Sequence, residues 1–156
     1  MTSFRLSDKA HIGYAHLRVP DLERSLAFYR DLLGFKEAHR REETVFLSAT
    51  GEAPYHIILT EDRNARPRQF QFPGLFHIAI RFPNRRELAR MFKRIHENRG
   101  HFQGFADHGV SEALYLADAD GNGIELYADI PRERWTRHNS QLEMVTKELD
   151  LDDLLR

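Results

Sequence analysis

Short alternating apolar segments and amphipathic stretches follow one another along the first half of the chain. Residues 12–19, IGYAHLRV, alternate as a strand does, and Pro20-Asp21 then ends the strand and caps the next segment. Residues 22–33 place apolar side chains at helical spacing and end at Gly34. Three further β-prone stretches come next, near 35–40, 44–49 and 55–60. The first half therefore predicts the order βαβββ.

The second half repeats this order. Residues 76–82 predict a strand, Pro83-Asn84 a break and a cap, and residues 85–100 a helix that ends at Gly100. Strands are expected after it near 102–105, 113–117 and 123–128. Two copies of a curved four-stranded unit that pair edge to edge predict an α+β fold, a half-barrel with a concave inner face. A generic α+β sandwich without a pocket is the alternative.

The chain length and the repeat predict the domain boundaries. A chain of 156 residues fits one domain, 1–156, with a buried core. We divide it into repeat A at about 10–60, a linker at 61–74, repeat B at about 75–128 and a tail at 129–156. The tail ends in ELDLDDLLR, which predicts either an amphipathic turn packed on the body or on a second subunit, or a frayed end.

Composition narrows the partners and the chemistry. The 24 acidic and 23 basic side chains nearly cancel, so no net field draws the chain to nucleic acid or to an anionic membrane. The chain has no cysteine, so a metal would have to be held by His, Asp, Glu or Tyr. The N-terminus lacks an apolar signal core, and no membrane-length apolar run occurs, which predicts a cytoplasmic protein.

Strand parity selects the candidate functional residues of the second half. In residues 123–128 the apolar Ile124 and Leu126 are expected to face the helices, which turns Glu125 toward the inner surface. The same argument turns His77 inward. A carboxylate in mid-strand among apolar neighbours is costly unless a buried Arg or a metal ion satisfies it.

The first half contributes further candidates to the same cavity. Tyr14 and His16 share a strand face, and the expected register makes His56 an inward residue, although a one-residue slip would reverse it. Two imidazoles and one carboxylate form the facial set of non-haem iron(II) oxygenases, and Zn, Mn or Ni could take the same ligands. The alternative is that His16 and His77 are ordinary satisfied polar residues and that Glu125 pairs with a nearby Arg.

The motifs HLRVPDLERSLAFYRDLLGF, GLFHIAIRFP and DHGVSEALYLADADGNGIELYAD resemble the vicinal-oxygen-chelate superfamily, and within it the catechol 2,3-dioxygenase-like, type I extradiol branch. The resemblance implies a pair of βαβββ units around one metal. His77 and Glu125 match the second and third ligands of the family. The family's first-ligand position is occupied by Tyr14, a departure. His16 on the same face is the candidate to replace it; the alternatives are that Tyr14 itself is the first ligand or that the site is altered or lost.

The resemblance also implies roles for three further residues. His56 resembles the family's acid/base histidine, and His108 and Tyr115 match two residues that lie close to the substrate. The implied function is metal-dependent extradiol cleavage of a catechol-type aromatic by dioxygen, most simply with iron(II), in a homodimer. The alternatives are a glyoxalase-like metal-dependent lyase or isomerase, and a non-catalytic small-molecule binding protein of the resistance type.

Overall fold

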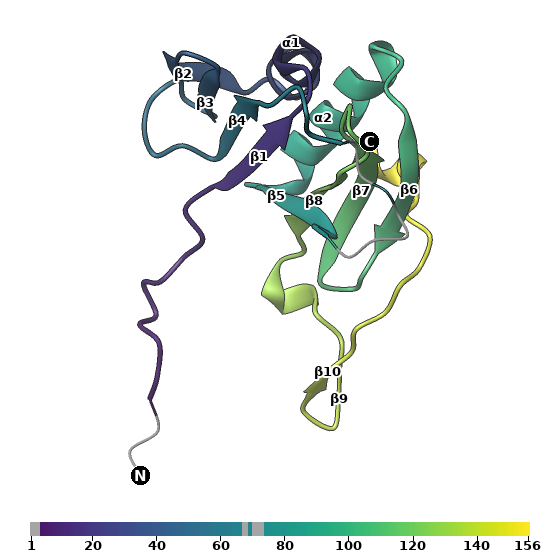
Figure 1. The fold of residues 1–156 in the computed structure, drawn as a ribbon. Coiled ribbons are helices and arrows are strands. Elements are labelled where there is room, and N and C mark those ends of the chain that lie inside the picture. Colours follow the sequence, from purple (N-terminus) through teal and green to yellow (C-terminus); the bar gives the residue numbers. More distant parts are fainter. Residues whose placement is uncertain (1–3, 67–68, 70–73) are drawn as a thin grey trace.

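The computed structural model describes residues 4–66, 69 and 74–156, and its elements follow the predicted order twice (Figure 1). The first unit comprises β1 (Ala15–Val19), α1 (Leu22–Leu26), the π-helix η1 (Ala27–Leu32), β2 (Lys36–Arg41), β3 (Thr44–Ser48) and β4 (Ile57–Glu61). The second unit comprises β5 (His77–Phe82), α2 (Arg85–Glu97), β6 (Phe102–Asp107), β7 (Ser111–Ala117) and β8 (Gly123–Asp129). The tail carries η2 (Arg132–Arg134), β9 (Arg137–His138), β10 (Gln141–Leu142) and α3 (Leu151–Leu154).

The two units have the same sheet topology, which confirms the predicted α+β fold of two βαβββ repeats. Their strand orders are β1-β4-β3-β2 and β5-β8-β7-β6, and in each unit the first strand lies parallel to the fourth. Each sheet therefore has its first strand at an edge. Among the described residues no ladder joins β1 to β5, so the expected edge-to-edge pairing of the two sheets is not formed within this chain.

Both helices begin where the sequence predicts. The Asp21 carboxylate accepts from the Arg24 N–H at 3.0 Å, and the Asn84 side chain accepts from the Glu87 N–H at 3.0 Å. The predicted helix at 22–33 changes character after α1, because the Leu33 N–H bonds to the carbonyl of Phe28, five residues earlier. Such wide turns are rare and local, and apolar spacing does not predict them.

The two units join through one shared core and a buried polar cluster. The fully buried Tyr29 of η1 donates to Oδ2 of Asp118, in the turn between β7 and β8, at 2.7 Å. Asp118 also accepts from the backbone N–H groups of Asp120 and Asn122 at 2.9 and 2.8 Å. Arg24 of α1 pairs with Asp120 in the same turn. These contacts stand in place of a shared strand ladder.

The tail packs on the second unit rather than fraying. Leu149 and Leu154 are 5% and 3% exposed and belong to the core, with α3 lying against α2. The N-terminal segment before β1 instead extends away from the body (Figure 1). In the part of the chain that the structure describes, no helix combines the length and the apolar character needed to cross a bilayer.

Candidate functional site

Three neighbouring strands of the second sheet place candidate residues on one face. Glu125 on β8 lies opposite Ala79 on β5 and Tyr115 on β7. The residues before and after Glu125, Ile124 and Leu126, are each 1% exposed and face the core on the other side of the sheet. Because strand side chains alternate, Glu125, Tyr115 and His77 all project from the open face of this sheet.

A continuous row of close polar contacts joins four of the predicted residues. Nε2 of His77 lies 3.0 Å from Oε2 of Glu125. The Tyr115 hydroxyl donates to Oε1 of the same carboxylate at 3.0 Å and lies 2.9 Å from Nε2 of His108. We call His77, Glu125, Tyr115 and His108 the polar row. His77 and Glu125, which strand parity places on one face, therefore lie in contact, and Tyr115 links this pair to His108.

The surroundings of Tyr115 hold its phenol in the neutral form. Burial is the main cause, followed by the hydrogen bond to Glu125 and the negative charge of that carboxylate, and together they raise the pKa of Tyr115 to about 12. Tyr115 is therefore a proton donor in hydrogen bonds at every physiological pH. One hydroxyl proton thus lies between a carboxylate and an imidazole.

Gly123 permits the close approach of β5 and β8 at His77. A side-chain Cβ at this position would lie 2.5 Å from the Phe76 carbonyl oxygen and 3.1 Å from Cβ of His77. Neither neighbour could give way without moving the β5 backbone. The absence of a side chain at Gly123 therefore helps to set the distance between His77 and Glu125.

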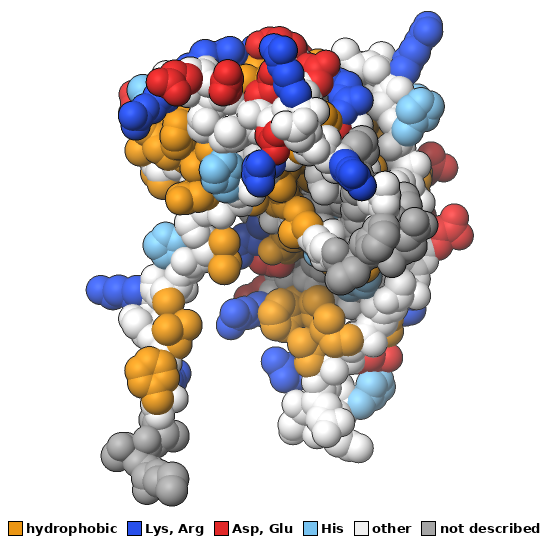
Figure 2. All heavy atoms as spheres, viewed as in Figure 1, with side chains coloured by type: hydrophobic (Ala, Val, Ile, Leu, Met, Phe, Trp, Pro, Cys, Tyr) orange, Lys and Arg blue, Asp and Glu red, His pale blue; other side chains and the backbone are white. Residues whose placement is uncertain are grey.

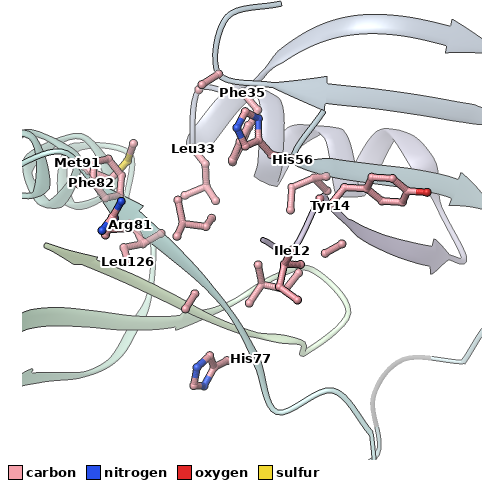
Figure 3. A pocket seen from close by; sticks show the side chains of 18 of the residues that line it. Ile12, Tyr14, Leu33, Phe35, His56, His77, Arg81, Phe82, Met91 and Leu126 are labelled. Carbon is pink, nitrogen blue, oxygen red and sulfur yellow. The ribbon is translucent and has the colours of Figure 1, made fainter. Parts of the chain in front are cut away.

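A cavity of about 700 Å³ lies between the two units and reaches His77 (Figure 3). His56 and Tyr14 also line it, and its walls are largely apolar, with Leu33, Phe35 and Met91 among them. In the space-filling view, apolar side chains lie along the N-terminal segment and on the body beside it (Figure 2). The cavity can thus hold an apolar or aromatic group with imidazoles at its edge.

His56 lies one residue before β4, rather than within the strand expected at 55–60. Its N–H bonds to the carbonyl of Leu47 at 2.9 Å, and its carbonyl accepts from the Ala15 N–H at 3.0 Å. These bonds fix the backbone, and the ring reaches the cavity near Phe35. The inward placement of His56 expected from the register is thus seen.

The structure does not bring His16 to the polar row. Nε2 of His16 lies 2.8 Å from the Thr60 hydroxyl on β4, and His16 is absent from the cavity lining. Tyr14 lines the cavity, but its side chain is 55% exposed and its ring is directed away from His77 (Figure 3). The physical reason is that β1 belongs to the first sheet, which is not paired with β5.

The donor set fits part of a metal site. The imidazole of His77 and the carboxylate of Glu125 converge, and both groups bind divalent transition metals. Within the described residues, no group of three or more His, Asp or Glu side chains is placed to hold a metal ion. The expected set of His16, His77 and Glu125 is therefore represented by two of its three members.

One contact of the site was not expected from the sequence. The Val145 carbonyl, in the C-terminal tail, lies 3.1 Å from Nδ1 of His108. A backbone carbonyl leaves no signature in side-chain patterns, and the tail carries no periodicity that relates it to His108. No sequence signal would have found this partner.

Comparison with known proteins identifies relatives of the whole chain. Residues 10–126 match the model of the Glyoxalase/Bleomycin resistance protein/Dioxygenase superfamily. The catechol-2,3-dioxygenase of Bacillus subtilis (strain 168) is 42% identical over 158 residues, which cover 99% of this chain and 54% of that protein. The manganese-dependent 2,3-dihydroxybiphenyl 1,2-dioxygenase of Geobacillus genomosp. 3 is 26% identical, over 80% of this chain and 38% of that protein.

The fold has counterparts among solved structures. A glyoxalase/dioxygenase from Nostoc punctiforme superposes with a TM-score of 0.67 at 18% identity, covering 84% of this chain and 100% of that one. At this identity the likeness concerns the fold alone. The chain spans about half the length or less of the two dioxygenases it matches, 54% and 38%.

Proposed function

Because the chain belongs to the glyoxalase/bleomycin resistance protein/dioxygenase superfamily, we propose that it forms the site of a metal-dependent extradiol dioxygenase that acts on a catechol-type aromatic. The polar row carries the proposal, since its three consecutive contacts join a pair of potential metal ligands, a neutral phenol donor and an imidazole. The two dioxygenase relatives support the reaction class.

His77 and Glu125 are the proposed protein ligands of the metal. Iron(II) is our first choice, with Mn, Zn or Ni as alternatives, and one relative is manganese-dependent. When bound, such a metal orients two reactants and lowers the pKa of a coordinated hydroxyl. Tyr14 and His16 are the candidates for a third ligand, and measuring metal content after replacing each by Ala would show which one contributes.

The remaining residues supply binding and proton transfer. The apolar cavity would hold the aromatic ring with its hydroxyls toward His77. His108 of the polar row, or His56 of the cavity lining, would accept the proton of a catechol hydroxyl, which is worth about 10²–10⁴ in rate. Tyr115, kept neutral by its surroundings, would donate a hydrogen bond to a substrate oxygen. The product would be a ring opened beside the two hydroxyls.

Ring cleavage by the purified chain tests the proposal. The full chain is incubated with iron(II) or manganese(II), catechol or 2,3-dihydroxybiphenyl, and dioxygen, and the yellow ring-fission product is followed by absorbance. We expect turnover that is lost in Glu125→Gln and kept in Glu52→Gln, an exposed carboxylate in the loop after β3. Turnover that survives in Glu125→Gln would reject the proposed site.

A non-catalytic aromatic-binding protein is the second candidate. The absence of a three-ligand group among the described side chains and the apolar cavity favour it. Tight binding of a catechol to the metal-free chain, without oxygen consumption after metal loading, would support this function. Turnover of a hemithioacetal with nickel or zinc would instead support glyoxalase-like chemistry.

A homodimer and a cytoplasmic location complete the proposal. β1 and β5 are both edge strands, and an unpaired edge is a template for pairing with another chain. Sedimentation of the purified chain tests the dimer, because a single species of monomer mass at micromolar concentration would argue against it.

A further inference from the structure

Residues 143–147 of the tail form a short strap across the end of β6. Asp107 and Lys147 exchange two backbone hydrogen bonds, each of 2.9 Å, in an antiparallel bridge. The Val145 N–H bonds to the His108 carbonyl at 3.3 Å. Gly109 has a φ of +74°, and a Cβ there would approach the Val145 side chain to 3.2 Å, so the glycine allows the strap to lie close.

The strap holds one nitrogen of the His108 ring. The Val145 carbonyl lies 3.1 Å from Nδ1, whereas Nε2 faces the Tyr115 hydroxyl at 2.9 Å. A carbonyl oxygen can only accept a hydrogen bond, so the Nδ1 contact is favourable only when Nδ1 carries the proton. In a neutral imidazole the other nitrogen then has a free lone pair.

We propose that residues 143–147 are a positioning element that fixes His108 in the Nδ1–H form, so that Nε2 is the basic atom facing Tyr115. Second partners of this kind fix ring orientation and tautomer in metal and catalytic sites. The strap acts mainly through the Val145 carbonyl, which is the nearer partner of Nδ1 at 3.1 Å; the Thr146 hydroxyl lies 3.4 Å from the same nitrogen and can also accept from its N–H.

The hydrogen-bond inventory of the polar row explains what this arrangement achieves. Tyr115 has one hydroxyl proton and two acceptor neighbours, Glu125 and the bare Nε2 of a neutral His108, so the neutral row leaves one of these two contacts without a proton. When Nε2 takes up a proton, Tyr115 donates to Glu125, Nε2 donates to Tyr115 and Nδ1 donates to Val145. All three contacts then carry one proton each. If the proposed function is right, this prepares Nε2 to receive the proton of a substrate hydroxyl.

Nitrogen-15 NMR of the full metal-free chain tests the tautomer directly. Long-range proton–nitrogen correlations distinguish an Nδ1–H ring from an Nε2–H ring, and the His108→Gln spectrum assigns the signal among nine histidines. The spectra are recorded about two pH units above the value of about 6.5 for free imidazole. We expect His108 to be in the Nδ1–H form. An Nε2–H ring would overturn the proposal, whatever the activity of the protein.

A strap variant tests whether residues 143–147 cause the tautomer. Lys147→Pro removes the N–H that bonds to Asp107, while the buried Leu149 and Leu154 stay in place. Met144→Pro is the matched control, because Met144 is 64% exposed and its N–H has no hydrogen bond within the described chain. We expect the Nε2–H form to appear in Lys147→Pro alone. If Lys147→Pro folds and its His108 stays in the Nδ1–H form, the proposal is refuted.

Kinetics separate this inference from the proposed function. In an active enzyme, Lys147→Pro should lower kcat by about tenfold to a hundredfold with an unchanged KM, because a misplaced base affects the transition state more than binding. An Nδ1–H ring in a chain that cleaves no catechol would uphold the strap and reject the dioxygenase. Turnover of a catechol by a chain whose His108 is in the Nε2–H form would support the dioxygenase and reject the role of the strap.

Discussion

Tyr29→Phe tests the polar contact that joins the two units. The substitution keeps the buried ring and removes the hydroxyl that donates to Asp118 at 2.7 Å. A hydrogen bond to a charged, buried group contributes about 1.5–3 kcal/mol, so we expect the free energy of unfolding to fall by about 2 kcal/mol. With a typical urea m-value of about 2 kcal/mol/M, the midpoint of urea unfolding should drop by about 1 M.

The same variant should change the stability at high pH. Burial, and next the Asp118 carboxylate, raises the pKa of Tyr29 in the folded state above the value of about 10 in an unfolded chain. Below pH 10 Tyr29 is protonated in both the folded and the unfolded state, so its contribution to the free energy of unfolding is fully present. Above pH 10 only the folded state keeps the proton, so the free energy of unfolding falls by about 1.4 kcal/mol per pH unit. Tyr29→Phe should lack this component.

Urea titrations at about pH 8 and pH 11 measure both effects in the wild type, Tyr29→Phe and Tyr127→Phe. Tyr127 on β8 is the control, because its hydroxyl has no hydrogen-bond partner in the described part of the chain. Equal urea midpoints for Tyr29→Phe and Tyr127→Phe at pH 8 would refute the stability assigned to the hydrogen bond between Tyr29 and Asp118. An undiminished loss of stability in Tyr29→Phe at pH 11 would refute the assignment of the alkaline effect.

Two further predictions concern the polar row. Gly123→Ala should lower the free energy of unfolding by about 1–3 kcal/mol, since the new Cβ would lie 2.5 Å from the Phe76 carbonyl oxygen. Gly104→Ala is the control, because a Cβ there meets nothing within 4 Å, and thermal unfolding of the two variants measures the difference. In a spectrophotometric titration, Tyr115 should ionise near its raised pKa of about 12, so Tyr115→Phe should remove a phenol ionisation at high pH. If the variant instead lost a phenol ionisation near pH 10, the usual value for tyrosine, the raised pKa of Tyr115 would be contradicted.

Strand alternation and helix-capping residues predicted most of the fold and the placement of His77 and Glu125 in the site. Strand alternation around Ile124 and Leu126 placed Glu125 on the open face, and the same alternation placed His77 beside it, because side chains on a strand repeat every two residues. The caps at Asp21 and Asn84 were readable for a similar reason, since the oxygen that accepts the helix N–H belongs to the residue itself.

What the sequence could not supply depends on how separate units meet. Parity placed His16 on the open face of its own strand, but parity does not say how the two sheets lie relative to each other, and His16 bonds to Thr60 instead of joining His77. The π-helical turn of η1 and the Val145 carbonyl at His108 depend on tertiary packing and backbone atoms. Neither has a periodic side-chain signature.

Metal affinity of the intact chain tests the central claim, that His77 and Glu125 together bind a metal. The chain is loaded with iron(II) or manganese(II), dialysed and analysed for metal by atomic emission, alongside His77→Gln, Glu125→Gln and the exposed control His101→Gln. The account predicts stoichiometric metal in the wild type and the control, and an affinity lower by more than about 10–100-fold in the two site variants. Equal retention by all four proteins, or none by the wild type, would contradict it.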